Sequence, residues 1–187
     1  GCGNGVIQRL IAEVVDELGM AEDTILVQGS GCSALNQGNW KCDVIRCLHG
    51  RPAAVATAVK RVQPDKLVYT MSGDGDACNI GLAETVSAAI RGEKFTMFLL
   101  NNSGFGETGG QMAFTTIIGQ VTPTTPYGRN PDIEGYPIHM PEMLAVQDGV
   151  AYLARVTVNS PASIRRAKAA VRRALQTQLA GLGFSMV

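Results

Sequence analysis

Two short polar groups in this 187-residue sequence contain residue types that bind phosphate and a divalent cation. They are the Gly-Asp-Gly-Asp sequence at residues 73–76 and the Asn-Asn pair at residues 101–102, and each follows an apolar run. Glycines let a backbone turn approach a phosphate closely, and the carboxylate of Asp74 is a hard oxygen ligand for Mg²⁺ or Ca²⁺. At neighbouring strand ends, the amide of Asn102 would lie beside Asp74, and a carbonyl from the next loop would complete a site for a metal and a diphosphate.

Alternating apolar β-rich runs and helical patterns predict the elements that position these groups. The expected strands cover residues 24–27, 67–71, 95–100, 152–158 and 184–187. The expected helices cover residues 5–18, 52–62, 80–90 and 161–179. This alternation predicts an α/β fold with three layers, in which helices cover both faces of a mostly parallel sheet. Ligands of such sheets bind at the carboxyl ends of the strands, where three of these runs end in glycine- or amide-rich turns.

A Gly-Asp-Gly sequence alone is also an ordinary turn, and that alternative applies to residues 73–76. The helix and strand that separate it from the Asn-Asn pair favour the binding site instead. Residues 103–137 show little periodicity, and so long a segment inside a compact domain is typical of a functional loop.

Length and composition limit the number of domains, the classes of binding partner and the cellular compartment. Length predicts one domain over residues 1–187, and the 16 basic and 16 acidic side chains provide no electrostatic case for nucleic acid or a membrane surface. No run is apolar enough to span a bilayer. Five cysteines are an odd number without disulfide density, which favours a cytoplasmic protein. Because the sequence begins Gly1-Cys2 without Met and stops inside an apolar run, we expect the natural protein to extend beyond both ends.

Several motifs together resemble those of a known enzyme family. The Gly-Asp-Gly and Asn-Asn groups resemble the thiamine diphosphate motif. The wider match comprises GCGNG at residues 1–5, GCS at 31–33, HGR at 49–51, GDGD at 73–76, TGGQ at 108–111 and TPYGR at 125–129. Over the whole chain these resemble the β subunit of 2-oxoacid:ferredoxin oxidoreductases, nearest the branched-chain, or 2-oxoisovalerate, type.

The resemblance implies a thiamine diphosphate-binding fold and a set of site residues. It implies that Mg²⁺ is held by Asp74, Asn102 and the backbone carbonyl of Gly104. The residues that it implies around the cofactor are Ser30, Gly31, Cys32, Ser33, His49, Gly75, Asp76, Gly106, Glu107 and Thr108. Glu107 departs from the family pattern, in which Met or Asn is more common at this position. An acid beside a diphosphate is unfavourable unless a metal or hydrogen bonds offset it.

The resemblance also implies a 4Fe–4S cluster beside the cofactor. Cys2 and Cys32 match two of its four cysteine ligands, and the other two positions fall outside this sequence, so the cluster is incomplete here. We interpret Cys42, Cys47 and Cys78 as small, buried apolar side chains.

The implied reaction is oxidative decarboxylation of a 2-oxoacid with coenzyme A, which yields an acyl-CoA, CO₂ and reduced ferredoxin. No residue is an obvious proton-transfer catalyst, so the activating base is expected from a partner α subunit, with γ and δ subunits as further partners. Two alternatives stay open: a subunit of a non-oxidative thiamine diphosphate-dependent decarboxylase, which needs no cluster cysteines, and a non-enzymatic module that binds a phosphate ligand.

Overall fold

The computed structural model describes residues 3–35 and 37–187, and its centre is one parallel sheet in the order β2-β1-β3-β4-β6-β5. The strands are β1 (Thr24–Gln28), β2 (Asp43–Arg46), β3 (Leu67–Gly73), β4 (Thr96–Leu100), β5 (Val150–Leu153) and β6 (Phe184–Met186). Every pairing between these neighbours is parallel, so their carboxyl ends share one edge of the sheet. The predicted α/β class is confirmed.

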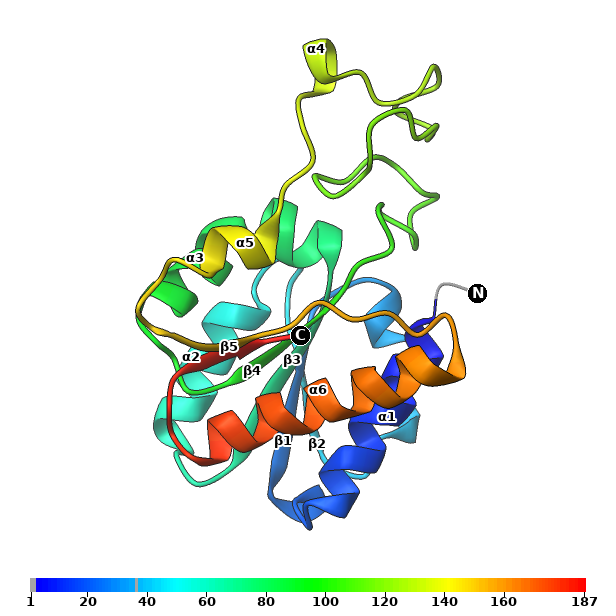
Figure 1. Cartoon of the computed structure of the whole chain (residues 1–187). Helices are drawn as coiled ribbons and strands as arrows, with labels where there is room; N and C mark the ends of the chain where they lie inside the picture. The colour runs from blue at the N-terminus through cyan, green and yellow to red at the C-terminus, as the bar shows by residue number, and fades with distance from the viewer. Residues whose placement is uncertain (1–2, 36) are drawn as a thin grey trace.

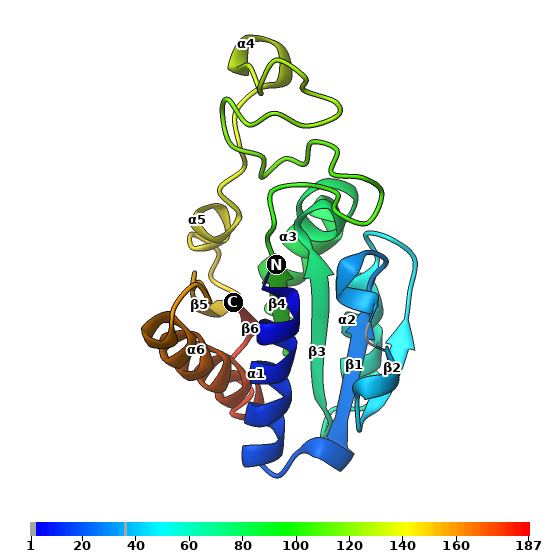
Figure 2. The same cartoon turned by 90° about the vertical axis from the view of Figure 1, so that its right-hand side faces the viewer.

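Helices cover both faces of the sheet, as the sequence predicts (Figures 1 and 2). On one face lie α1 (Asn4–Glu17) and α6 (Pro161–Leu179), and on the other lie α2 (Pro52–Val62) and α3 (Leu82–Ile90). Side chains of β3 alternate between the two cores: Val68 packs towards α2 and α3, whereas Tyr69 packs towards α1 and α6. Two shorter helices, α4 (Pro131–Glu134) and α5 (Met140–Leu144), precede β5.

Local signals explain where α6 begins. The side chain of Ser160 caps α6 by accepting a hydrogen bond from the Ser163 amide at 3.2 Å, and Pro161 occupies the first turn. Buried Ala167, Val171 and Leu175 recur on one face of this helix, which therefore packs on the sheet. Among the described residues, no helix is long and apolar enough to cross a membrane.

Two strands differ from the sequence prediction. The strand expected over residues 152–158 spans Val150–Leu153 instead, because its described neighbour is β6, which has only 3 residues with which to pair. The strand β2 was not predicted, since it is an edge strand whose residues are mostly exposed and form no apolar run. The expected helix over residues 80–90 begins at Leu82, and a wider helical turn over Gly75–Ile80 joins it to β3.

Residues 103–139, here called the excursion, leave the carboxyl edge of the sheet and project from it (Figure 1). Its one α-helical turn among the described residues is α4, and two isolated β-bridges, Phe105 with Gln111 and Thr122 with Thr125, tie it locally. The absence of periodicity over this segment in the sequence corresponds to an absence of regular structure.

Candidate functional site

A pocket lies at the carboxyl edge of the sheet, between the segments that follow β1, β2, β3 and β4. All predicted cofactor and magnesium residues line it: Ser30, Gly31, Cys32, Ser33, His49, Asp74, Gly75, Asp76, Asn102, Gly104, Gly106, Glu107 and Thr108. The structure therefore brings together residues that are up to 78 positions apart, from Ser30 to Thr108. Four further residues line the pocket: Gly73 and Asn4, which belong to matched motifs without a predicted role of their own, and Leu100 and Phe105, which were not predicted.

Asp74 follows β3 directly and is only 1% exposed. Its Oδ2 atom accepts hydrogen bonds from the Gly104 amide at 3.0 Å and from the Thr115 hydroxyl. Burial raises the pKa of Asp74, and the bonds from Thr115, Gly75 and Gly104 offset part of that rise. A nearby cation would stabilise the ionised form of this buried carboxyl group.

The two residues of the Asn-Asn pair, at the end of β4, have different roles. The side chain of Asn101 accepts a hydrogen bond from the Ser103 amide at 2.9 Å, which stabilises a tight turn in which Ser103 has a φ of 63°. This turn leaves Asn102 and Gly104 facing the pocket. The Gly104 carbonyl accepts a hydrogen bond from the Gly106 amide at 3.1 Å. A carboxylate, an amide and a carbonyl are oxygen donors that suit Mg²⁺.

Asp76 lies beside His49 in a different arrangement. Its Oδ1 atom is 2.6 Å from His49 Nδ1 and also accepts the Gly50 amide. Burial raises the pKa of Asp76, and the hydrogen bonds from Gly50 and His49 partly offset this rise. Because a carboxylate accepts at Nδ1, the Nδ1 atom carries the proton. Asp76 thus orients the imidazole ring, which also meets the Phe105 ring edge-on at 5.9 Å between centroids.

Glycines bring the pocket walls close together. A Cβ atom on Gly106 would lie 2.9 Å from Asn102 Nδ2 and 3.3 Å from Cys32 Sγ. A Cβ atom on Gly75 would lie 2.3 Å from the Phe105 ring. Real side chains do not fit at these distances, so the glycines are required by the close approach of the loops.

Glu107 occupies the exposed rim of the pocket. A Cβ atom on Gly31, across the pocket, would be 4.0 Å from Glu107 Oε2. Solvent at this position would screen the repulsion expected between this carboxylate and a bound phosphate.

The thiols fall into two groups. Cys32 is half-buried and lines the pocket, whereas Cys2 lies outside the described residues. Within residues 3–35 and 37–187, no group of three or more His, Cys, Asp or Glu residues is placed to hold a metal ion. Cys42 and Cys47 are half-buried against the two cores, and Cys78 is fully buried. Burial raises the pKa of Cys47 to about 11 and that of Cys78 to about 12. Cys78 is therefore buried as predicted, whereas Cys42 and Cys47 are only partly buried.

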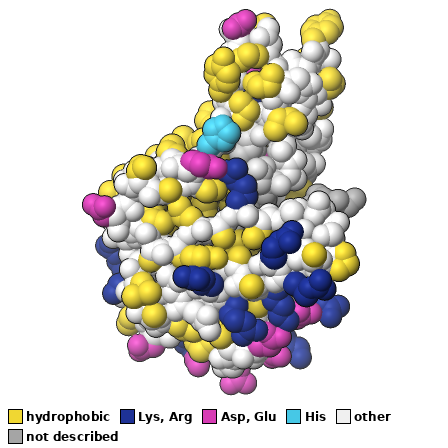
Figure 3. Space-filling model, viewed as in Figure 1, with side chains coloured by type: hydrophobic (Ala, Val, Ile, Leu, Met, Phe, Trp, Pro, Cys, Tyr) yellow, Lys and Arg dark blue, Asp and Glu magenta, His cyan; other side chains and the backbone are white. Residues whose placement is uncertain are grey.

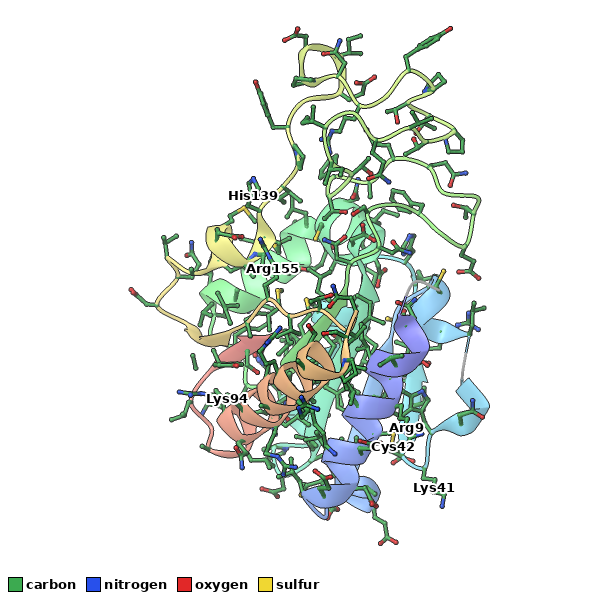
Figure 4. The ribbon with its side chains drawn as sticks, turned by 45° about the vertical axis from the view of Figure 1, so that its right-hand side comes forward. Arg9, Lys41, Cys42, Lys94, His139 and Arg155 are labelled. Atoms are coloured by element: carbon green, nitrogen blue, oxygen red, sulfur yellow. The ribbon has the colours of Figure 1, made fainter. Side chains whose placement is uncertain are left out.

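The second histidine has no part in the pocket. His139 is exposed at the base of the excursion, near Arg155, which pairs with Glu142 at 2.6 Å (Figure 4). It is not among the residues that line the pocket.

One residue that contacts the site had no recognisable signal in the sequence. Thr115 is 41 residues from Asp74 in the chain and lies in the excursion, where it has no periodic pattern or motif around it. Asn4, by contrast, lies within the matched motif at residues 1–5, and this position was a usable signal.

Comparisons with known proteins agree with this geometry. Residues 29–185 match the family model described as thiamine pyrophosphate enzyme, C-terminal TPP binding domain. The chain is 44% identical over its full length to the ketoisovalerate oxidoreductase subunit VorA of Methanothermobacter marburgensis. It is 38% identical, over 89% of its length, to the 2-oxoglutarate synthase subunit KorB of Methanocaldococcus jannaschii.

A solved structure is similar over 99% of this chain, with a TM-score of 0.84 and 25% identity. It is the 2-oxoglutarate:ferredoxin oxidoreductase from Magnetococcus marinus, with 2-oxoglutarate, coenzyme A and succinyl-CoA bound. This chain spans 39% of the length of the VorA relative and 60% of that of both KorB and the solved chain. The resemblance to 2-oxoacid:ferredoxin oxidoreductase subunits is confirmed. The chain belongs to the thiamine pyrophosphate enzymes, as a member of their C-terminal TPP-binding domain family.

Proposed function

We propose that this chain is the thiamine diphosphate-binding part of a 2-oxoacid:ferredoxin oxidoreductase that acts on a branched-chain 2-oxoacid. The reaction is oxidative decarboxylation with coenzyme A, which yields an acyl-CoA, CO₂ and reduced ferredoxin. One observation carries the proposal: residues predicted from separate motifs line a single pocket at the carboxyl edge of the sheet. Full-length similarity to a ketoisovalerate oxidoreductase subunit supports the branched-chain substrate.

The residues present fit a metal-bound diphosphate. Asp74, Asn102 and the Gly104 carbonyl would hold Mg²⁺. This ion binds oxygen ligands and is commonly held by one or two carboxylates together with the phosphates of the ligand. The glycines at 31, 75 and 106 let the backbone approach the phosphates, and the hydroxyls of Ser30, Ser33 and Thr108 border the same space. When bound, thiamine diphosphate supplies the nucleophilic carbon and the electron sink for decarboxylation.

His49 is suited to hold a proton at a defined place. The Asp76 carboxylate fixes the proton on Nδ1 and the Phe105 ring limits rotation of the imidazole. The other ring nitrogen then has a fixed position in the pocket wall. We assign His49 to orienting the cofactor and leave the activating base to a partner subunit.

Partner subunits complete the site in this proposal. The pocket holds about 120 Å³, below the roughly 300–1,000 Å³ typical of sites that enclose an organic ligand, so this chain encloses only part of the cofactor. Large hydrophobic side chains are exposed along the excursion (Figure 3), namely Phe114, Ile117, Ile118, Val121, Tyr127, Ile133 and Tyr136. An α subunit would cover this surface, and ferredoxin would receive the electrons.

Cofactor binding and turnover test the proposal separately. Calorimetry should show thiamine diphosphate binding in Mg²⁺ and its loss in excess chelator, with no comparable binding of ATP or NAD. The full complex should then reduce a viologen dye in a CoA-dependent reaction with a branched-chain 2-oxoacid. Binding of ATP or NAD in place of thiamine diphosphate would favour a general phosphate-binding module, and decarboxylation without dye reduction would favour a non-oxidative enzyme.

The iron–sulfur cluster has its own test. Cys32 and Cys2 would contribute two thiolates, and the remaining ligands would come from outside this sequence. We therefore expect the 187-residue chain alone to retain no stable 4Fe–4S cluster after anaerobic reconstitution and desalting. A full complement of iron and sulfide on the isolated chain would show that Cys42, Cys47 or Cys78 serves as a ligand.

A further inference from the structure

Arg129 is buried in the excursion although it lines no part of the pocket, with 3% of its surface exposed. Its guanidinium donates hydrogen bonds to main-chain carbonyl groups from two stretches of the excursion: Ala113, Phe114, Thr116, Glu134, Gly135 and Tyr136. The bonds to Phe114 and Tyr136 are 3.0 and 2.9 Å long. A buried guanidinium is costly unless its donors are satisfied, so this arrangement ties the two stretches together.

The first of these stretches contacts the predicted metal site directly. Phe114 and Thr116, whose carbonyls Arg129 holds, flank Thr115, and the buried hydroxyl of Thr115 donates to Asp74 Oδ2. The Thr116 hydroxyl donates to the Ser103 carbonyl at 2.7 Å, in the turn between Asn102 and Gly104. The stretch therefore touches both strand-end segments from which the metal ligands would come.

We infer that Arg129 and Thr115 are positioning residues for the metal site. Arg129 holds the backbone of residues 113–116, this backbone places the Thr115 hydroxyl, and the hydroxyl together with the Gly104 amide orients the Asp74 carboxylate before a cation arrives. The inference rests on the proposed function, because it takes Asp74 as a metal ligand. Orienting a ligand through its hydrogen-bond partners increases metal affinity, and such partners are effective when packing fixes their own positions.

The competing explanation is that Arg129 only stabilises the excursion. A purely structural role would alter thermal stability and would leave the Asp74 carboxylate and its metal requirement unchanged. Two measurements separate these roles in the full chain. One is hydrogen exchange of the Gly104 amide without cofactor, which reports the bond to Asp74. The other is the Mg²⁺ concentration that half-saturates thiamine diphosphate binding.

Thr115→Val, Thr115→Ser and Thr122→Val form the first series. Thr115→Val should accelerate exchange at Gly104 and raise the half-saturating Mg²⁺ concentration by about tenfold, since a hydrogen bond to a charged group is lost. Thr115→Ser restores the hydroxyl and should return both values to near wild type. Thr122 is a matched control, because it is another buried threonine of the excursion. In the described part of the chain, its hydroxyl forms hydrogen bonds with Thr124 and Thr125 and with no residue of the pocket.

Arg129→Met and the double variant Arg129→Met/Thr115→Val form the second series. Arg129→Met should reproduce both effects of Thr115→Val, and the double variant should be no worse than Arg129→Met, because one residue acts through the other. If Arg129→Met does not fold, the Thr115 series still decides the role of Thr115. Arg129→Lys then replaces Arg129→Met, because lysine keeps the positive charge but lacks the planar guanidinium.

The outcomes distinguish this inference from the proposed function. Variants with lower thermal stability but wild-type Gly104 exchange and Mg²⁺ dependence would overturn the positioning role. Wild-type protein that takes up no thiamine diphosphate in Mg²⁺ would refute the proposed function instead. In that case the exchange rates of Gly104 alone would still decide whether Arg129 and Thr115 orient Asp74.

Discussion

Two buried carboxylates at opposite edges of the sheet have different surroundings. Glu93 lies just before β4, at the amino edge, and is 7% exposed; its Oε1 atom accepts Arg91 Nε at 2.8 Å and also Arg61. Asp74 follows β3 at the carboxyl edge, is 1% exposed, and accepts the Thr115 hydroxyl and the Gly104 amide.

The different donors have opposite consequences for ionisation. Burial raises the pKa of both carboxyls; two guanidinium groups outweigh this effect at Glu93, whose pKa is lowered. Hydroxyl and backbone donors do not outweigh it at Asp74, whose pKa stays raised. The amino edge thus uses a buried charge to stabilise the fold. The carboxyl edge contains a buried carboxyl whose neighbours favour its ionised form less strongly, and a raised pKa of this kind is typical of functional sites.

The largest expected effect comes from Asp74→Asn. It should weaken Mg²⁺-dependent thiamine diphosphate binding by about a hundredfold or more, because a buried ionic partner is removed. The folded-state pKa of Asp74 lies above the unfolded one, so ionisation costs stability as pH rises, and a neutral amide removes that cost. The cofactor-free variant should therefore melt at the wild-type temperature or above it. Calorimetry and thermal melts measure the two effects, and a melting point several degrees lower would contradict the comparison.

Substitution of two glycines compares a crowded left-handed turn with an open one. Gly50, at the carboxyl edge, and Gly19, before β1, have positive φ values of 79° and 68°. A Cβ on Gly50 would lie 2.5 Å from the Ile80 side chain and 2.8 Å from the Gly81 nitrogen, whereas that on Gly19 would meet nothing within 4 Å.

Gly19→Ala should therefore cost about 1–2 kcal/mol of unfolding free energy, from backbone strain alone. Gly50→Ala should cost about 1–3 kcal/mol more, because overpacking adds to the same strain. Denaturant unfolding of both variants measures the difference, and equal losses would mean that Ile80 and Gly81 can move away from the new side chain.

Glu93→Gln should destabilise the protein by about 1–2 kcal/mol at pH 7, because charge-assisted hydrogen bonds are weakened. The lowered pKa makes the contribution of Glu93 fully present above its unfolded pKa of about 4.3, and it is lost as pH falls through the lower folded pKa. The difference between wild type and variant should shrink over that range.

Glu142→Gln is the matched control for this change, since its pair with Arg155 is exposed on both sides and should contribute about 0–1 kcal/mol. Equal effects of the two variants in urea titrations would remove the distinction between a buried and a surface ion pair.

The smallest expected effect concerns Cys47, whose pKa is about 11, raised first by burial and then by the charge of Asp76. Asp76→Asn should lower this pKa, yet leave it above the ordinary value of about 8.5, because burial remains. The pH dependence of thiol alkylation at Cys47 measures the change. A return to the ordinary value would show that the charge of Asp76, rather than burial, dominates at this edge.

The sequence predicted correctly the elements whose local pattern matches their burial in the fold. The buried strands β1, β3 and β4 are continuous apolar runs between glycine or amide turns, and α6 has a capping serine and an apolar face. The edge strand β2 lacked that signal because exposed edges need no apolar run. The length of β5 depends on how many residues of β6 face it, which no local pattern records.

The sequence by itself determined the residue types of the pocket: glycines, Asp74 and the Asn-Asn pair at strand ends, whose chemistry and spacing pointed to one edge of a parallel sheet. Tertiary structure alone decided which groups complete them. Thr115 reaches Asp74, and Arg129 holds the backbone around Thr115, from an excursion without periodicity. The physical reason is that parallel strands bring their carboxyl ends together by a general rule, whereas contacts made by an irregular loop depend on the particular path of its backbone.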